Sequence, residues 1–449
     1  MQEEIKPLTR EQKQAVGLLS IGTFLEYFDL MLYVHMAALL NELFFSASNP
    51  NNKILVLAFT FCSTYLLRPI GALIFGWIGD NLGRKHTVVI TTFIMAISCI
   101  TIAILPTYDK IGITASCVVI ICRLLQGMSS MGEIIGAEIY LTETIKSTSK
   151  YPAVALLPFV AALGGVFALG VASLSTLGGN EYWRGAFLVG AIVAIVGSIA
   201  RTTLRETPDF VDAKARLKRT FEIIDKNPQI LDNTQMSQKK VNLKTSLALF
   251  LIRCPWPVCF YIAYIHCGNI LQTSFGYTSE QVIHQNFIVS IVEMLGVLPL
   301  IYLSNKIYSL SILKFRSILF SISIILLPFL LNNVKTPFDL LLIQSFIMFF
   351  VLDTVPAIPI LYKYFPIFRC FTTTAFIYAL SRAIMFLITS CLCVFLIDYY
   401  GNYGLLFIII LTIIGYLLGV LHFEKLEKES GNYPQKKKDF VHDVAENMS

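Results

Sequence analysis

Three polar side chains share one face of the first long apolar segment of this 449-residue chain. Glu26, Asp29 and Tyr33 fall within about 60° of arc at the helical period, with Gly22 on the same side. An ionised side chain at the centre of a membrane span costs roughly 2.5 to 3.5 kcal/mol, so these carboxylates should face protein or water. A carboxylate in such a place can take up and release a proton as its surroundings change.

A second polar face lies further along the chain. Arg123, Gln126, Glu133 and Glu138 occupy about 140° of arc of one helix, and the opposite side is apolar. The simplest arrangement brings the two faces together, with Arg123 near Asp29 or Glu26 and with Glu133 and Glu138 lining a shared cavity. The alternative is a set of fixed ion pairs that only hold the helices together. Glu143, at the end of the same helix, is expected to be solvated.

An aromatic stripe follows in the second half of the chain. Arg253, Trp256, Phe260 and Tyr264 share one helical face, which could hold a quaternary ammonium group by cation–π attraction. Packing against other helices is the more common use of such a stripe. The residues predicted to bind substrate are therefore Tyr33, Arg123, Gln126, Trp256 and Tyr264. The carboxylates predicted to couple a proton are Glu26, Asp29, Glu133 and Glu138.

Other charges inside apolar segments are isolated in the sequence. Glu293, Asp353 and Arg382 each lie in a different segment, and an Asp353–Arg382 pair is one hypothesis. Arg68, followed by a proline, is expected to anchor a helix end. The ten cysteines show no metal-ligand spacing and are expected to be small apolar fillers. We therefore expect no metal and no organic cofactor.

The composition indicates what holds these residues in place. With 55% hydrophobic and 14% charged residues, the chain is too apolar for an ordinary soluble protein, and it should be an integral membrane protein. Only helices satisfy their own backbone in lipid, so the fold should be all-α. Twelve apolar segments are long enough to span a bilayer. They lie near Val16–Leu40, Ile54–Ile78, Thr87–Leu105, Ile111–Leu141, Pro152–Leu174, Gly185–Ile199, Ser246–Cys267, Val282–Leu303, Ile312–Leu331, Phe338–Leu361, Phe371–Ile397 and Tyr403–Leu421.

Charge and loop lengths predict the topology and the domains. If the N-terminus is cytoplasmic, 27 of the 35 lysines and arginines lie on that side, which favours both termini inside. The predicted parts are a cytoplasmic N-terminus (1–15), a six-helix half (16–200), a cytoplasmic linker (201–244), a second six-helix half (245–422) and a cytoplasmic tail (423–449). The first apolar segment carries acids and lacks a cleavage site, so it should be retained as a span.

The segment GWIGDNLGRKH, Gly76 to His86, inserts glycines and charges directly after the second span. Glycines let helices approach closely, and an acid facing a basic pair can form a clasp that breaks as helices move. A plain topology signal is the other interpretation. The predicted gating residues are Gly76, Asp80, Gly83, Arg84 and Lys85.

These features resemble the major facilitator superfamily. Its loop signature looks like Gly76 to Lys85, although Asn81 departs from the usual basic residue, and its second signature is similar to RLLQG (123–127). Within it, GTFLEYFDLMLY (22–33), RLLQGMSSMGE (123–133) and ETPDF (206–210) resemble the metabolite:proton symporter branch. That branch includes osmolyte transporters for proline and betaine, and carriers of dicarboxylates, citrate and shikimate. Two departures are the single glycine before Glu133 and the absence of an acid in the second-half counterpart of the loop, Leu303–Lys306.

The resemblance implies a twelve-helix, two-half secondary transporter that works by alternating access. No nucleotide-binding or hydrolase motif is present, so an ion gradient, with the proton as coupling ion, should drive uptake. We expect uptake of small zwitterionic osmolytes such as proline or glycine betaine. The alternatives are a small organic acid as substrate, or a solute sensor that does not transport. A monomer in a bacterial inner (plasma) membrane, with no nucleic-acid partner and no enzyme activity, completes the expectation.

Overall fold

The computed structural model describes residues 7–45, 67–177, 183–226 and 241–434. Within these ranges every regular element is helical, which confirms the predicted all-α fold. Nine helices of the described residues are long and apolar enough to cross a membrane by length and composition. Two shorter apolar helices lie at Trp183–Ile199 and Pro337–Phe349. Most of the predicted span Ile54–Ile78 lies outside the described residues, so the count of twelve and the orientation stay predictions.

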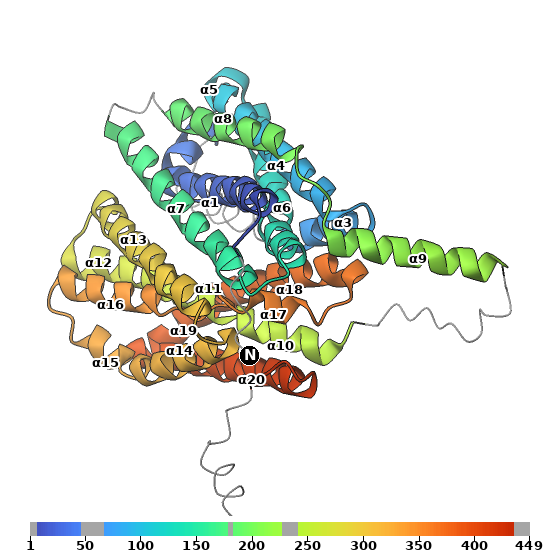
Figure 1. The fold of residues 1–449 in the computed structure, drawn as a ribbon. Helices are drawn as coiled ribbons and strands as arrows, with labels where there is room; N and C mark the ends of the chain where they lie inside the picture. The colour runs from blue at the N-terminus through green and yellow to red at the C-terminus, as the bar shows by residue number, and fades with distance from the viewer. Residues whose placement is uncertain (1–6, 46–66, 178–182, 227–240, 435–449) are drawn as a thin grey trace, which may run out of the picture.

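The N-terminal helices gather in one group (Figure 1). They are α1 (Arg10–Phe44), α3 (Arg68–Asn81), α4 (Arg84–Ile104), α5 (Tyr108–Ile111), α6 (Ile113–Thr144), α7 (Lys150–Leu177) and α8 (Trp183–Arg201). The helix α9 (Pro208–Lys226) extends away from this group in the connecting segment (Figure 1).

The C-terminal helices form a second group (Figure 1). They are α10 (Leu243–Arg253), α11 (Pro255–Phe260), α12 (Cys267–Phe275), α13 (Ser279–Ser304), α14 (Ser309–Ile324), α15 (Leu327–Asn332), α16 (Pro337–Phe349), α17 (Ile358–Tyr362), α18 (Ile367–Ile388), α19 (Val394–Tyr400) and α20 (Gly404–Glu429). The grouping follows the predicted halves, but the domain boundaries themselves remain a prediction.

The most extensive contacts between the two groups are made by two helix pairs. Helix α7 packs against α13, and α3 packs against α18. At the second contact Gly76 is required, because a Cβ there would lie 2.5 Å from the Cα of Thr372. A side chain at Gly79 would meet the Phe371 ring at 2.4 Å. The predicted use of these glycines for close helix approach is confirmed.

The segment from residue 243 to 275 is interrupted where it passes the interior. Helix α10 ends at Arg253, and prolines follow at Pro255 and Pro257. Neither proline can donate the backbone hydrogen bond that a continuous helix requires. A π-helix, η2 (Tyr261–His266), comes next. Gln344 of α16 donates its amide Nε2 to the carbonyl of Ala263 at 2.6 Å. That bond supports the backbone at the wide turn, which presents its side chains to the interior.

Candidate functional site

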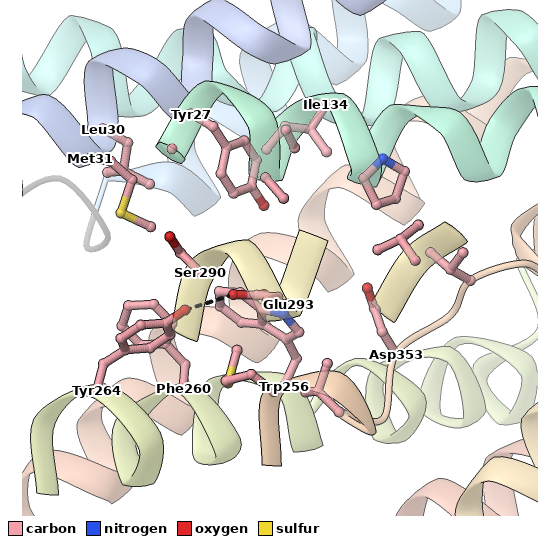
Figure 2. A pocket seen from close by; sticks show the side chains of 18 of the residues that line it. Tyr27, Leu30, Met31, Ile134, Trp256, Phe260, Tyr264, Ser290, Glu293 and Asp353 are labelled. Atoms are coloured by element: carbon pink, nitrogen blue, oxygen red, sulfur yellow. Dashed lines mark hydrogen bonds between the residues drawn. The ribbon is translucent and has the colours of Figure 1, made fainter. Parts of the chain in front are cut away.

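A cavity of about 310 Å³ lies between the N-terminal and C-terminal helices. In Figure 2, Tyr27, Leu30 and Met31 of α1 face Phe260 and Tyr264 of the interrupted segment across it. Its volume is at the lower end of the range of roughly 300 to 1,000 Å³ typical of small-molecule sites. The cavity can therefore enclose a compact solute.

Charged side chains of both signs line this cavity in equal number. They are Glu138, Arg253, Glu293, Arg316, Asp353 and Arg382. Five of them come from the C-terminal helices or their connections, and one comes from α6. Among the described lining residues, three carboxylates and three guanidinium groups give a formal net charge of zero, with both signs present at the cavity.

The aromatic stripe forms one wall of the cavity. The ring centroids of Trp256 and Phe260 lie 5.2 Å apart, and those of Phe260 and Tyr264 lie 4.8 Å apart. The Tyr264 hydroxyl donates a hydrogen bond of 3.0 Å to Oε2 of Glu293 (Figure 2). Trp256 and Tyr264, predicted to bind substrate, thus both face the cavity.

Arg382 covers part of this wall. Its guanidinium carbon lies 3.8 Å from the Trp256 ring centroid, within the range of a cation–π contact. The hypothesis of an Asp353–Arg382 pair is wrong: among the described residues, the cation within 4.0 Å of Asp353 is Arg253, whose Nη1 lies 3.7 Å away. Arg382 therefore occupies the face of the Trp256 ring that the sequence predicts could hold a substrate cation.

Arg253 and Glu138 connect the two helix groups at the cavity. Nη2 of Arg253 lies 3.0 Å from Oε2 of Glu138, and the Tyr362 hydroxyl donates to the same oxygen. Arg253 also bonds the Tyr362 hydroxyl oxygen at 2.8 Å. All three side chains are buried. Glu138 is thus a cavity residue tied to the C-terminal helices.

Arg123 lies where the sequence placed it, but its predicted role in binding substrate does not fit its surroundings. Its Nη1 contacts Oδ2 of Asp29 at 3.2 Å and Oε1 of Gln126 at 2.9 Å. Gln126 in turn donates to Oδ1 of Asp29 at 2.8 Å. The expected proximity of Arg123 to Asp29 is confirmed. Neither Arg123 nor Gln126 is among the described residues that line the cavity, because Asp29 holds both inside the N-terminal group.

Glu133 is also absent from the described cavity lining, so the expectation that it shares a cavity with Glu138 is wrong. Its carboxylate pairs with Arg201 at the end of α8, and it accepts hydrogen bonds from Thr91 (2.9 Å) and Thr92 (2.5 Å). The side chain of Arg201 is fully buried, although its position suggested a solvated linker. The two glutamates diverge because they lie five residues apart on α6, about 140° around the helix.

The remaining two residues of the α1 face differ in what can be described. Glu26 is buried beside Arg68, with 3.5 Å between its Oε1 and Nη2 of the arginine. It is not among the described lining residues of the cavity. The side chain of Tyr33 lies outside the described part of the structure, so its predicted role stays a prediction.

The loop after α3 joins the two helix groups at the contact between α3 and α18. Asp80 accepts hydrogen bonds from the backbone amides of Phe371 (3.0 Å) and Thr372 (2.8 Å) and from the Thr372 hydroxyl (2.7 Å). The partner of the Gly76–His86 loop is therefore the first turns of α18. The missing acid in Leu303–Lys306 leaves this contact intact.

Arg84 extends the same contact. Its Nη2 donates to the carbonyl of Ile367 (2.7 Å) and pairs with Glu143 (2.8 Å). Glu143 is buried and also accepts from the Thr207 hydroxyl at 2.6 Å, so the expectation that it is solvated is wrong. The ETPDF segment, which looked like a connector, folds over the loop and supplies this partner.

The turn into α4 is closed by the same segment. Gly83 has a φ of 129°, a conformation that a side chain would strain. The Glu206 carboxylate accepts hydrogen bonds from the backbone amides of Arg84 (2.9 Å) and Lys85 (3.3 Å). These amides lie at the N-terminus of α4, where a negative charge is favoured. The five predicted gating residues thus lie together, while their gating role stays a prediction.

Nearby, an exposed ion pair fastens α9 to the end of α6. Lys146 Nζ lies 2.8 Å from Oδ1 of Asp209, and this hydrogen bond raises the pKa of the lysine above its usual value. Phe210 packs beside it, with its ring 4.9 Å from the Arg84 guanidinium carbon and 6.0 Å from the Phe368 ring. The linker therefore contacts both helix groups.

Two groups of membrane helices with a binding cavity between them are typical of secondary transporters. The sugar (and other) transporter family matches residues 16–351, and the chain belongs to that family. It is a multi-pass membrane transporter of the major facilitator superfamily and not an enzyme.

Curated relatives and solved structures agree with this assignment. The chain is 28% identical over 312 residues to the proline/betaine transporter of Escherichia coli (strain K12), which covers 66% of this chain and 61% of that protein. It is 35% identical over 208 residues to a putative metabolite transport protein of Haemophilus influenzae, with 45% and 46% covered. The chain thus spans about three fifths or less of these relatives.

Two solved structures show the same fold. The major facilitator proton:xylose symporter XylE bound to 6-bromo-6-deoxy-D-glucose has a TM-score of 0.74 at 14% identity, over 92% of this chain and 95% of that one. The human organic anion transporter MFSD10 has a TM-score of 0.66 at 14% identity, over 93% and 100%.

Sequence reasoning missed two cavity arginines and one buried partner. No role is predicted for Arg316 from the sequence, yet this arginine is buried, lines the cavity and donates to the carbonyl of Phe349 at 3.1 Å. Arg201 was assigned to the linker, and Arg382 was given no binding role. The signal for Arg316 was its position five residues inside a predicted helix, where a charge is costly.

Proposed function

We propose that this protein is a proton-coupled symporter that takes up small zwitterionic osmolytes, such as proline or glycine betaine, by alternating access. The names of its curated relatives suggest this class of substrate. The bacterial relatives also support a place in a bacterial inner membrane. We propose that the monomer is the transporting unit, because the cavity lies within one chain.

The observation that carries this proposal is the charge balance of the cavity. Three carboxylates and three arginines line one small volume that also has an aromatic wall. A zwitterion adds no net charge to this lining. Its anionic group can contact an arginine, and its cationic group can contact a carboxylate. A dicarboxylate would bring two negative charges beside three carboxylates, and like-charge contacts of this kind cost several kcal/mol. The charge balance therefore favours the zwitterion over the organic acid.

We propose that the buried carboxylates supply the coupling. Asp29, Glu26, Glu133 and Glu138 each contact an arginine, so protonation would weaken that contact and free the helices that it joins. Glu138 is the one of these four that lines the cavity and contacts the C-terminal helices. It gives the most direct route between an occupied site and a change of helix packing.

The cytoplasmic gate in this proposal is the contact between the Gly76–His86 loop and α18. For the cavity to open on that side, Asp80 must release the backbone of α18 and Arg84 must release the Ile367 carbonyl. Gly76 and Gly83 would permit the close packing of the closed gate, and the backbone amide of Lys85 would hold Glu206 in place.

Uptake into proteoliposomes tests the proposal. The purified full chain, given radiolabelled proline and an inward proton gradient, should accumulate proline until an uncoupler collapses the gradient. Unlabelled glycine betaine should compete, and ketoglutarate and citrate should not. Binding without uncoupler-sensitive accumulation would indicate a sensor, and competition by the acids alone would indicate an organic-acid carrier.

The coupling step has its own test. Glu133→Gln and Glu138→Gln should each be compared for accumulation against a gradient and for exchange without one. A coupling carboxylate should lose accumulation and retain exchange. Wild-type accumulation in either variant would remove that residue from the mechanism.

A further inference from the structure

The guanidinium group of Arg382 lies close to two aromatic rings at the cavity. Its guanidinium carbon lies 3.8 Å from the Trp256 centroid and 5.0 Å from the Tyr378 centroid, and its side chain is buried. Tyr378 lies four residues earlier on α18, and Trp256 lies on α11. Cation–π contacts with rings on two different helices thus hold the guanidinium group in place before any ligand binds.

Two nitrogen atoms of this side chain, Nε and Nη1, are buried without a hydrogen-bond partner among the described residues. The other cavity arginines are engaged, since Arg253 contacts Glu138 and Arg316 donates to a backbone carbonyl. A buried N–H without an acceptor is costly and therefore rare, which indicates a group that an acceptor from outside the chain can satisfy.

Glu293 provides a negative charge that complements Arg382. Its carboxylate accepts a 3.0 Å hydrogen bond from the Tyr264 hydroxyl, and both side chains face the cavity (Figure 2). Among the described residues no cationic nitrogen lies within 4.0 Å of its carboxylate, whereas Glu138 and Asp353 share Arg253. Among the described cavity residues, Arg316 and Arg382 form no ion pair, but only Arg382 has buried donors without any hydrogen-bond partner, and Glu293 is the carboxylate without a cationic partner.

We propose that Arg382 binds the carboxylate of the substrate and that Glu293 binds its cationic nitrogen. This assignment rests on the proposed function and specifies its substrate site. Guanidinium N–H groups match carboxylate oxygens, and the hydrogen bonds are charge-assisted. Because Arg382 covers the face of Trp256, that face is closed to a quaternary ammonium. A nitrogen that carries N–H can donate to Glu293, so the site prefers an amino or imino acid such as proline to glycine betaine.

Binding to the purified full-length protein tests the assignment. The probes are proline, glycine betaine, proline methyl ester and succinate, with affinities measured by titration calorimetry. The variants are Arg382→Gln, Arg382→Lys and Glu293→Gln. The control is Arg184→Gln, because Arg184 also stacks on a tryptophan, at 4.6 Å from the Trp183 centroid, but its donors bond the carbonyls of Ala103 and Leu105.

The wild type should bind proline about 10- to 100-fold more tightly than the ester, which lacks the anionic carboxylate. Arg382→Gln should abolish that difference, Arg382→Lys should keep part of it, and the Arg184→Gln control should keep all of it. Glu293→Gln should weaken proline and ester alike by about tenfold or more and should strengthen succinate. The comparison of proline with its ester in the wild type needs no substitution, so a variant that fails to fold leaves that result intact.

The assignment is overturned if Arg382→Gln discriminates proline from its ester as the wild type does, or if Glu293→Gln binds proline normally. Tighter binding of glycine betaine than of proline would contradict the role of Glu293. Failure of the proposed function has a different signature, which is wild-type binding with no accumulation in proteoliposomes. Normal uptake by Arg382→Gln would instead keep the function and reject the site.

Discussion

Replacing Glu138 with glutamine should shift the protein away from the conformation in which α6 and α10 are in contact. The Glu138 carboxylate accepts from Arg253 at 3.0 Å and from the Tyr362 hydroxyl, across the boundary between the helix groups. Glutamine keeps one oxygen acceptor but loses the charge. A hydrogen bond to a charged group contributes about 1.5 to 3 kcal/mol, and breaking a buried pair costs about 3 to 5 kcal/mol.

The range of about 1.5 to 3 kcal/mol applies here, because Asp353 lies 3.7 Å from Arg253 and partly compensates the charge of this arginine. The lost energy applies only to the conformation in which α6 and α10 are in contact. At about 1.4 kcal/mol per factor of ten, the population of that conformation should fall about 10- to 100-fold relative to the open one.

The assay is the distribution of distances between spin labels at positions 82 and 307, measured in a background in which the native cysteines are replaced. Leu82 directly follows α3, Ile307 follows α13, and both are exposed. Glu138→Gln should populate longer distances. The matched control is Glu424→Gln, since Glu424 pairs with Lys428 and Lys314 within the C-terminal helices. An unchanged distribution in Glu138→Gln, or an equal shift in the control, would refute the reasoning.

Three further predictions concern the helix contacts. Gly76→Ala should lower thermal stability by about 1 to 3 kcal/mol, because its Cβ overlaps the backbone of α18. Gly185→Ala should leave stability unchanged or raise it slightly, since a Cβ there meets nothing within 4 Å and alanine favours a helix more than glycine does. A thermal-unfolding comparison that ranks the two alike would contradict this. Asp80→Asn should shift the label distances in the same direction as Glu138→Gln, because an amide cannot accept all the α18 donors that the carboxylate accepts; wild-type distances would count against the gate. Gln344→Leu should weaken proline binding about tenfold by removing the 2.6 Å bond to the π-helix carbonyl, and unchanged affinity would show that the aromatic wall needs no such support.

Much of the architecture could be predicted because it depends on local properties. Apolar segments of bilayer length specify helices in lipid, and the helical period specifies which residues share a face. The aromatic face of Trp256 and Tyr264 and the approach of Arg123 to Asp29 followed from these two facts. The Gly76–His86 loop carried its own signal, since close packing at Gly76 requires the absence of a side chain.

The residues near helix ends were harder to predict. Arg201 and Glu143 looked solvated because their neighbours in sequence are polar. In the structure they are buried by segments distant in the chain, Arg201 beside Glu133 and Glu143 beside Arg84 and Thr207. Hydropathy averages over a window and cannot register a partner that arrives from elsewhere.

The sequence by itself determined a helical membrane transporter, the family to which it belongs and the set of charges that must avoid lipid. The tertiary structure decided how those charges pair. It joined Arg123 to Asp29 and Arg253 to Glu138, and it placed Arg382 and Glu293 at the cavity with no ion-pair partner in the part of the chain that the structure describes. The reason is that a helical period defines directions around one helix, whereas a pairing also depends on the rotation and the axial offset of its neighbours. Those are settled only when the helices pack.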